Sequence, residues 1–225
     1  MQSLTFLIKK HHYILETREK LKQFGNIPIT KDILVSILGE YKSPMQKLVT
    51  LEKRGDLMRI KRDLYVVSPI VTNKKISLGL IANHIYHPSY VSFNYALREY
   101  GLIPERVFAI KSMTTGRSRE ISTSLGEFSY QQCKPEYFQI GITMKQEDDI
   151  TYMIATPEKA LCDLIISTTG LNLRYIEETR EYLEENIRFD MEALANMNTD
   201  IIRACAGAGK KEKTLLNIIK IINKL

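Results

Sequence analysis

The chain has 225 residues, of which 44% are hydrophobic, and its net charge is +6 at pH 7. This length can bury one sizeable core and a smaller second one, so we expect two domains. Three widely spaced cysteines without a CxxC pair argue against a disulfide framework or a zinc ribbon. The LTFLI run at residues 4–8 is too short for a signal peptide, and no apolar stretch has membrane-spanning length. We therefore expect a soluble, cytoplasmic protein with no membrane partner.

The first predicted elements are two helices separated by a turn. Thr30 can cap a short helix, and Gly39 provides the break that lets the chain turn toward the next one. Ser43 suits the N-cap of this second helix, and Pro44 suits its first turn. The apolar stripe of the first helix consists of Ile33, Leu34, Ile37 and Leu38.

At about 100° per residue, the second helix separates into two faces. The polar and cationic face covers an arc of roughly 120°. It consists of Gln46, Lys47, Thr50, Lys53 and Arg54. We expect the other face to pack against the protein, and it consists of Met45, Leu48, Val49 and Leu51.

A β-hairpin is predicted directly after this helix. Gly55 ends the helix, and two β-prone runs, Leu57–Ile60 and Leu64–Val67, follow it. The loop between them consists of Lys61, Arg62 and Asp63. Asp63 lies where a tight turn often has glycine, and aspartate tolerates a left-handed backbone better than most residues. The order helix, turn, helix, hairpin is typical of a winged helix-turn-helix with a basic wing tip.

The positive charge is concentrated in the predicted N-terminal domain, residues 1–70. This segment carries 13 Lys and Arg against 7 Asp and Glu, whereas residues 71–225 carry 19 of each. Cations that neutralise phosphates supply most non-specific affinity for DNA, so the asymmetry favours a DNA-binding domain. A solvated basic surface would have the same charge, and it is the order of the elements that favours DNA.

After a break near residues 68–75, the pattern predicts a mixed α+β domain over residues 76–225. Its predicted helices cover residues 76–85 and 92–100, and its predicted strands cover residues 106–113, 120–123, 127–132, 138–144 and 150–154. Leu125 and Gly126 form the expected hairpin turn.

The end of the chain is predicted to be helical. Thr156 as cap and Pro157 in the first turn open a helix that runs through Ile166. Residues 173–187 form an acidic helix, which is most often a solvated face. The last helix, near residues 215–225, is too apolar to stand alone, so it either packs on its own domain or forms the interface of a homodimer.

We find few residues that could carry out chemistry. His84 and His87 have no carboxylate or thiol at ligand spacing, and Asp163 looks structural. The GAGKK run at residues 207–211 lacks the first glycine and the hydroxyl residue of a phosphate loop, so we interpret it as a flexible link. The sequence therefore predicts no enzyme activity, no cofactor and no metal site.

Four ordered segments of the chain resemble a known protein family. They are RDLYVVSP, LIANHIYHPSYVSFNYALREYGLIPERVFAI, LGEFSYQQCKPEYF and YMIATPEKALCDLI, within residues 45–167. This order is similar to the AbiEi-type antitoxins of bacterial abortive-infection toxin–antitoxin systems. Asp63 stands where many of those proteins have glycine in the wing. The fold expected is α+β: an N-terminal winged helix-turn-helix, then a mixed α+β domain with a helical C-terminal tail.

The resemblance implies a transcriptional autoregulator that binds inverted repeats in its own promoter and opposes a co-encoded nucleotidyltransferase-like toxin. The DNA-binding residues would be Ser43, Gln46, Lys47, Thr50, Lys53 and Arg54 on the second helix, and Arg59, Lys61 and Arg62 on the wing. Gln46 is the best candidate for contacting a base edge, because glutamine pairs bidentately with adenine, but an ordinary surface glutamine explains it equally well. The alternative function is a winged helix that docks a partner protein, with DNA binding incidental.

Overall fold

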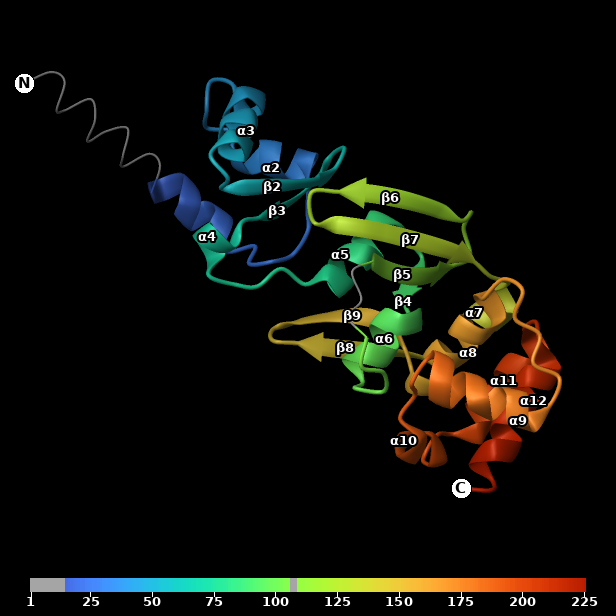
Figure 1. Ribbon diagram of the computed structural model, residues 1–225. Helices are drawn as coiled ribbons and strands as arrows, with labels where there is room; N and C mark the ends of the chain where they lie inside the picture. Colours follow the sequence, from blue (N-terminus) through green and yellow to red (C-terminus); the bar gives the residue numbers. More distant parts are fainter. Residues whose placement is uncertain (1–14, 106–108) are drawn as a thin grey trace, which may run out of the picture. The chain divides into compact units, whose positions relative to one another are not determined.

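The structure is a computed structural model that describes residues 15–105 and 109–225 (Figure 1). It contains two β-sheets and many helices, so the predicted mixed α+β class is confirmed. The chain divides into two compact units. Unit 1 extends as far as Ile81 and includes Thr123–Leu125, and unit 2 comprises Ala82–Ser122 and Gly126–Leu225. The LTFLI run and residues 106–108, where one strand was predicted to begin, lie outside the described residues.

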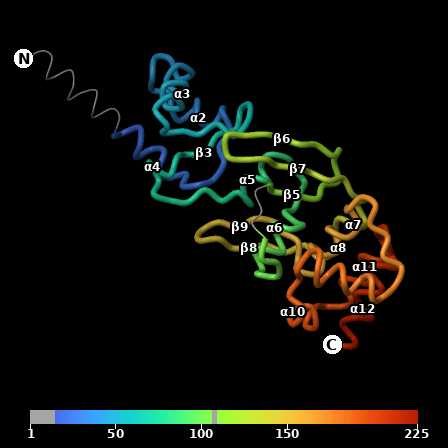
Figure 2. The backbone as a smooth tube through the Cα atoms, in the orientation of Figure 1, coloured from blue at the N-terminus to red at the C-terminus, as the bar shows by residue number. Residues whose placement is uncertain are grey.

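Unit 1 combines helices with a small antiparallel sheet. Residues 15–22 are helical. The following elements are β1 (Ile29–Thr30), α2 (Lys31–Ile37), α3 (Pro44–Lys53), β2 (Leu57–Lys61), β3 (Leu64–Val67) and α4 (Pro69–Thr72). The sheet has the order β1-β3-β2, with antiparallel neighbours. The tube in Figure 2 follows the chain from α2 through α3 into the β2–β3 hairpin. The two helices and the hairpin were predicted at nearly these bounds.

Local sequence explains where α3 begins and ends. Pro44 occupies its first turn, where the missing N–H costs nothing. Ser43 is the N-cap residue, as predicted, but its side chain accepts no capping hydrogen bond. At the other end Gly55 takes a left-handed backbone (φ +74°). The N–H of Gly55 then bonds to the carbonyl of Glu52, and that of Asp56 to the carbonyl of Leu51, which is the Schellman pattern of helix termination.

Unit 1 has its own hydrophobic core. Leucines from the first helix, α2, α3 and β2 are at most 1% exposed, and they pack together with residues of β1 and β3. These core residues include Leu21, Ile29, Leu34, Leu38, Leu48, Leu51, Leu57 and Val67. The predicted stripe of α2 is only partly correct, because Leu34 is buried whereas Ile33 is 48% exposed. Residues three to four apart share one helix face, so Ile33 lies beside the stripe on the solvent side.

Unit 2 is built around a six-stranded mixed sheet. Its strands are β4 (Ser89–Val91), β5 (Ala109–Thr114), β6 (Arg119–Thr123), β7 (Gly126–Gln132), β8 (Ile142–Glu147) and β9 (Ile150–Ala155). The sheet order is β6-β7-β5-β4-β9-β8, in which β5 pairs parallel with β7 and β4 parallel with β9. The hairpin predicted here is present, but its turn consists of Ser124 and Leu125, one residue earlier than expected, and Gly126 begins β7. The strand predicted over residues 138–144 is wrong at its start: Pro135–Phe138 form the short helix α7, and β8 begins at Ile142, just after Gly141 takes a left-handed backbone.

Helices make up the rest of unit 2. They are α5 (Leu78–Ile85), which continues from unit 1, α6 (Phe93–Glu99), α8 (Pro157–Ser167), α9 (Ile176–Glu181) with the π-helical turn η1 (Tyr182–Asn186), α10 (Met191–Ala195), α11 (Thr199–Ala208) and α12 (Glu212–Ile222). Thr156 caps α8 through the N–H of Lys159, as predicted. The last helix, α12, begins three residues earlier than predicted and buries its apolar side within the unit. The link predicted at residues 207–211 is shorter than expected, because Gly207 and Ala208 complete α11 and only residues 209–211 connect it to α12.

Candidate nucleic-acid interface

The exposed face of α3 differs from the face predicted on the helical wheel. Leu48 and Leu51 are buried, as expected. Met45 and Val49, which were expected to pack with them, are 50% and 44% exposed. At about 100° per residue, the side chains exposed to solvent cover an arc of roughly 140°. They are Met45, Gln46, Val49, Thr50 and Lys53. The outer face of α3 is therefore part apolar, part amide and hydroxyl, and carries one cation.

Lys47 belongs to the flank of the helix and not to this outer face. It is only partly exposed, and its ammonium nitrogen lies 4.2 Å from the centre of the Tyr41 ring. A cation held over an aromatic face in this way is attracted by the ring quadrupole. Lys47 is therefore less exposed than the wheel predicts for a residue beside Gln46, because its ammonium lies over the ring of Tyr41 in the loop before α3.

Arg54 forms an ion pair within unit 1. It is the C-cap residue of α3, and its guanidinium lies 3.1 Å from Oδ2 of Asp56, which is fully buried. Arg18 donates to Oδ1 of the same carboxylate from Nε (3.0 Å) and Nη2 (2.7 Å). A buried carboxylate requires such partners, because an unpaired charge in the interior is costly. Arg54 was predicted to contact DNA, but its first role is to neutralise Asp56 together with Arg18.

The polar residues predicted for the interface lie at the surface. Ser43, Gln46 and Thr50 are all exposed. The hydroxyl of Thr50 donates to the carbonyl of Gln46 (2.8 Å), which leaves its oxygen lone pairs free to accept a hydrogen bond. The amide of Gln46 can both donate and accept, so this face could satisfy a base edge or a phosphate.

The β2–β3 hairpin, predicted as the wing, has a tight two-residue turn, Arg62–Asp63, because Lys61 still belongs to β2. Asp63 takes the left-handed backbone (φ +62°) that its position required in place of glycine. Its carboxylate lies 3.0 Å from the ammonium of Lys31 and 3.6 Å from the guanidinium of Arg62. The hydrogen bond from Lys31 is the main cause that lowers the pKa of Asp63. The hairpin turn is thus held to the start of α2 by an ion pair, while the side chain of Arg62 is 90% exposed.

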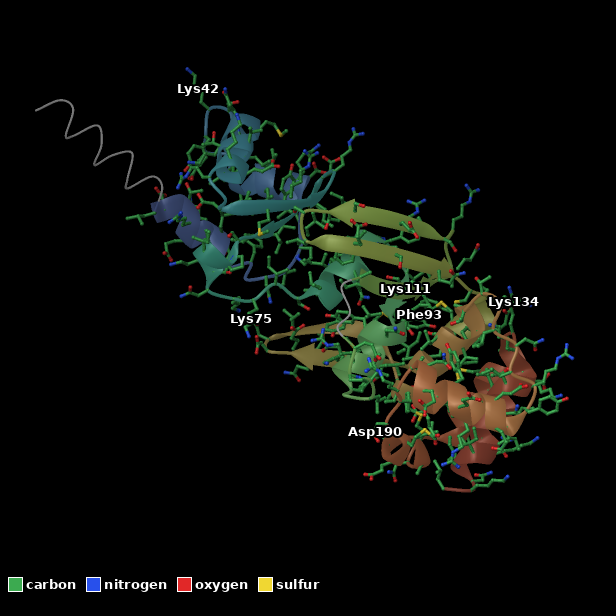
Figure 3. The ribbon with its side chains drawn as sticks, in the orientation of Figure 1. Lys42, Lys75, Phe93, Lys111, Lys134 and Asp190 are labelled. Carbon is green, nitrogen blue, oxygen red and sulfur yellow. The ribbon has the colours of Figure 1, made fainter. Side chains whose placement is uncertain are left out.

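Basic side chains remain at the surface after these internal pairs are counted. Lys42, Lys53, Arg59 and Arg62 are all exposed. Lys42 projects from the loop before α3 (Figure 3). Arg59 and Arg62 lie on or beside the hairpin, and Lys53 lies on the outer face of α3. The loop before α3, the helix α3 and the β2–β3 hairpin each present a cation to solvent.

The buried charges of unit 2 form an enclosed network. Lys159 and Asp163 are both 0% exposed, and the Lys159 ammonium lies 3.4 Å from Oδ1 of Asp163. Asp163 also accepts hydrogen bonds from the hydroxyls of Ser92 (2.6 Å) and Tyr137 (2.7 Å), and Lys159 donates to the carbonyl of Tyr137 (2.8 Å). Burial raises the pKa of Asp163, and the charge of Lys159 opposes this rise. The network joins α6, α7 and α8, which agrees with the structural role expected for Asp163.

The described residues contain no group of three or more His, Cys, Asp or Glu side chains placed to bind a metal ion. No helix in the described part of the chain combines the length and the apolar character needed to cross a membrane. No known protein family matches the chain in a scan against family models, and no curated protein matches its sequence.

The sequence reasoning missed the exposed pair Met45 and Val49. Both are apolar, and the wheel assigned every apolar residue of α3 to the packed side. The wheel alone carried no signal of this, because Met45 and Leu48 lie three apart and the four apolar residues form one continuous arc of roughly 160°. Only the packing of the domain shows that Leu48 and Leu51 are buried whereas Met45 and Val49 are exposed.

Proposed function

We propose that unit 1 is a winged helix that binds duplex DNA, with α3 as recognition helix and β2–β3 as wing. The order of elements, the three-stranded antiparallel sheet and the tight basic turn at Arg62–Asp63 support this proposal. In such domains the recognition helix lies in the major groove, and positively charged side chains around it contact the phosphates.

The observation that carries the proposal is the surface made by the outer face of α3 and the cations around it. Gln46 and Thr50 offer hydrogen bonds to base edges. Met45 and Val49 offer apolar contacts of the kind that thymine methyl groups accept in the major groove. Lys42, Lys53, Arg59 and Arg62 are exposed cations available for phosphate contacts, whereas Lys47 and Arg54 also make contacts within unit 1.

We further propose that the protein is an antitoxin and transcriptional autoregulator without catalytic activity. It would bind inverted repeats in its own promoter and counteract a co-encoded nucleotidyltransferase-like toxin. The toxin part rests on the resemblance to AbiEi-type antitoxins, within residues 45–167. Inverted repeats call for two copies of the chain on one operator, either as a homodimer or as cooperating monomers.

Fluorescence anisotropy tests the DNA-binding part of the proposal. Labelled duplex from the region upstream of the gene is compared with a scrambled duplex at several salt concentrations. We expect a preference of about a hundredfold or more for the native sequence, and affinity that falls steeply with salt. Equal weak binding to both duplexes would mean that the basic surface binds DNA only through non-specific electrostatic attraction.

Co-expression tests the antitoxin part. We expect the chain to restore the growth of cells that express the neighbouring nucleotidyltransferase-like protein. Loss of growth rescue in the presence of intact, correctly folded chain would contradict this part without affecting the DNA-binding result.

A second candidate function is a winged helix that docks a partner protein. The exposed apolar side chains of Ile33, Met45 and Val49 favour it, because exposed apolar residues also mark protein interfaces. Co-purification with the neighbouring gene product, together with no promoter shift at physiological salt, would support this function over DNA binding.

A further inference from the structure

A hollow of about 400 Å³ lies within unit 2, and none of the residues proposed to bind DNA lines it. Its walls come from the end of β7 and the start of α7, from the C-terminal end of α8, and from the turn between α11 and α12. A volume of this size is within the range of pockets that hold small organic ligands.

The charged side chains that line the hollow are all cations. They are Lys134, Lys210 and Lys211, and no Asp, Glu or His lines it among the described residues. Burial raises the pKa of the Cys133 thiol to about 11, so this lining group is neutral at physiological pH. No carboxylate forms an ion pair with these three lysines within the residues that the structure describes. The hollow is therefore positive, and its charge is not compensated locally.

The turn that carries two of these lysines is held in place by close contacts. A Cβ atom on Gly209 would lie 2.6 Å from the carbonyl oxygen of Cys205 and 2.9 Å from Cε2 of Tyr137, so only glycine fits there. Lys211 has a left-handed backbone (φ 57°, ψ 39°), which costs a residue other than glycine about 1 kcal/mol. Strain of this kind persists only where the surroundings hold it, and it is frequent at binding sites.

Lys211 is also fixed by its side chain. Its ammonium donates hydrogen bonds to the carbonyl of Ile165 (2.9 Å), in the last turn of α8, and to that of Thr168, the C-cap residue of this helix. A lysine ammonium has three N–H donors, so one remains for a ligand. Lys134 and Lys210 are exposed and can move onto a bound anion, and Figure 3 labels Lys134 at the start of α7.

The remaining lining matches a ligand with one anionic end and one organic end. Ser167, Thr169 and Gln132 provide hydrogen-bond donors, while Met113 and Ile166 provide apolar contacts. A phosphate group carries close to two negative charges and three acceptor oxygens at neutral pH, which suits several lysines and hydroxyls better than a single carboxylate would. We propose that this hollow binds a small phosphomonoester, whose phosphate contacts Lys134, Lys210 and Lys211 and whose organic part lies against Met113 and Ile166.

Isothermal titration calorimetry of the full chain tests the proposal with ribose 5-phosphate, adenosine 5′-monophosphate and inorganic phosphate as separate probes. We expect at least one of the two organic phosphates to bind saturably and more tightly than inorganic phosphate. The double variant Lys134→Met/Lys210→Met should weaken that binding by about tenfold or more. Both side chains are exposed, so the variant should fold like the wild type, which circular dichroism can check.

Lys213→Met is the matched control, because Lys213 is an exposed lysine two residues beyond Lys211 that does not line the hollow. Its affinity for the organic phosphate should equal that of the wild type. Three results would each overturn the proposal: no saturable heat from either organic phosphate up to about 10 mM, inorganic phosphate binding as tightly as the organic ones, or equal weakening by the control variant.

Discussion

The apolar pair on the outer face of α3 gives the sharpest prediction about DNA recognition. If α3 lies in the major groove, Met45 and Val49 should bury thymine methyl groups against side chains that are now 50% and 44% exposed. Replacing every thymine of the operator by deoxyuridine removes these methyl groups and leaves base pairing intact. The wild-type protein should therefore bind the substituted operator more weakly.

The size of this effect follows from the buried area. Burying one methyl group contributes about 0.8 kcal/mol, which corresponds to about a fourfold change in the dissociation constant. If each of the two side chains covers one methyl group, the loss should be about fifteenfold at constant salt. The double variant Met45→Ala/Val49→Ala should bind the native operator more weakly, and it should lose most of its sensitivity to deoxyuridine.

A double-mutant cycle measures the coupling between the two apolar side chains and the thymine methyl groups. The affinities of the wild type and of each variant for the native and the deoxyuridine operator are compared by anisotropy competition. Ile33→Ala is the matched control, because Ile33 is a comparably exposed apolar residue on α2 and lies outside the proposed contact face. It should keep the full sensitivity to deoxyuridine. Selective binding of the native operator with the same deoxyuridine effect in wild type and double variant would refute the placement of α3, although not DNA binding itself.

Three further predictions concern the charges. Lys53→Ala and Arg62→Ala should each reduce DNA affinity and lower the slope of log affinity against log salt by about one, and Lys220→Ala, an exposed lysine of unit 2, should leave that slope unchanged in anisotropy titrations. Asp56→Asn should lower the free energy of unfolding by about 2 kcal/mol in urea denaturation. This is less than the cost of breaking a fully buried ion pair, because the side chains of Arg18 and Arg54 are about one third exposed. An unchanged urea midpoint would contradict the stabilising role assigned to Arg54. In Lys159→Met the pKa of the buried Asp163 should rise further, because its opposing cation is lost. A raised folded-state pKa means that the native state binds protons more tightly than the unfolded state, so the urea midpoint of this variant should increase as the pH falls from neutrality toward the ordinary carboxyl value of 3.8. A midpoint that changes with pH as in the wild type would argue against this.

The sequence predicted local elements well where local chemistry decides them. Pro44 and Gly55 mark the two ends of α3, and Thr156 with Pro157 marks the start of α8, because caps and terminators act on the backbone of their own residues. Asp63 was predicted to tolerate a left-handed backbone in the wing, and it has one. The strand order of the six-stranded sheet was not predicted, since β4 pairs with β9 across more than sixty residues and no short pattern encodes such a pairing.

The predicted interface was less accurate because the helical wheel considers each charge alone. Arg54 lies in the polar arc that the wheel predicts for α3, but its guanidinium pairs with Asp56, a residue beyond the end of the helix. Lys47 depends in the same way on Tyr41, which precedes the helix. Both partners lie within seven residues in sequence, yet they become neighbours only once the turns around α3 have formed.

These internal pairs alter how the charge of the N-terminal segment should be interpreted. Part of the cationic excess in residues 1–70 stabilises the domain, through Arg18 and Arg54 at Asp56 and Lys31 at Asp63. The exposed cations considered above lie on three different elements, and the outer face of α3 carries one of them, Lys53, at its C-terminal end. In a DNA-binding domain this arrangement places phosphate contacts at the rim and sequence-sensitive contacts in the middle. Substitutions at the rim should therefore change affinity alike for all sequences, whereas substitutions at Met45, Gln46 or Val49 should change the preference among sequences.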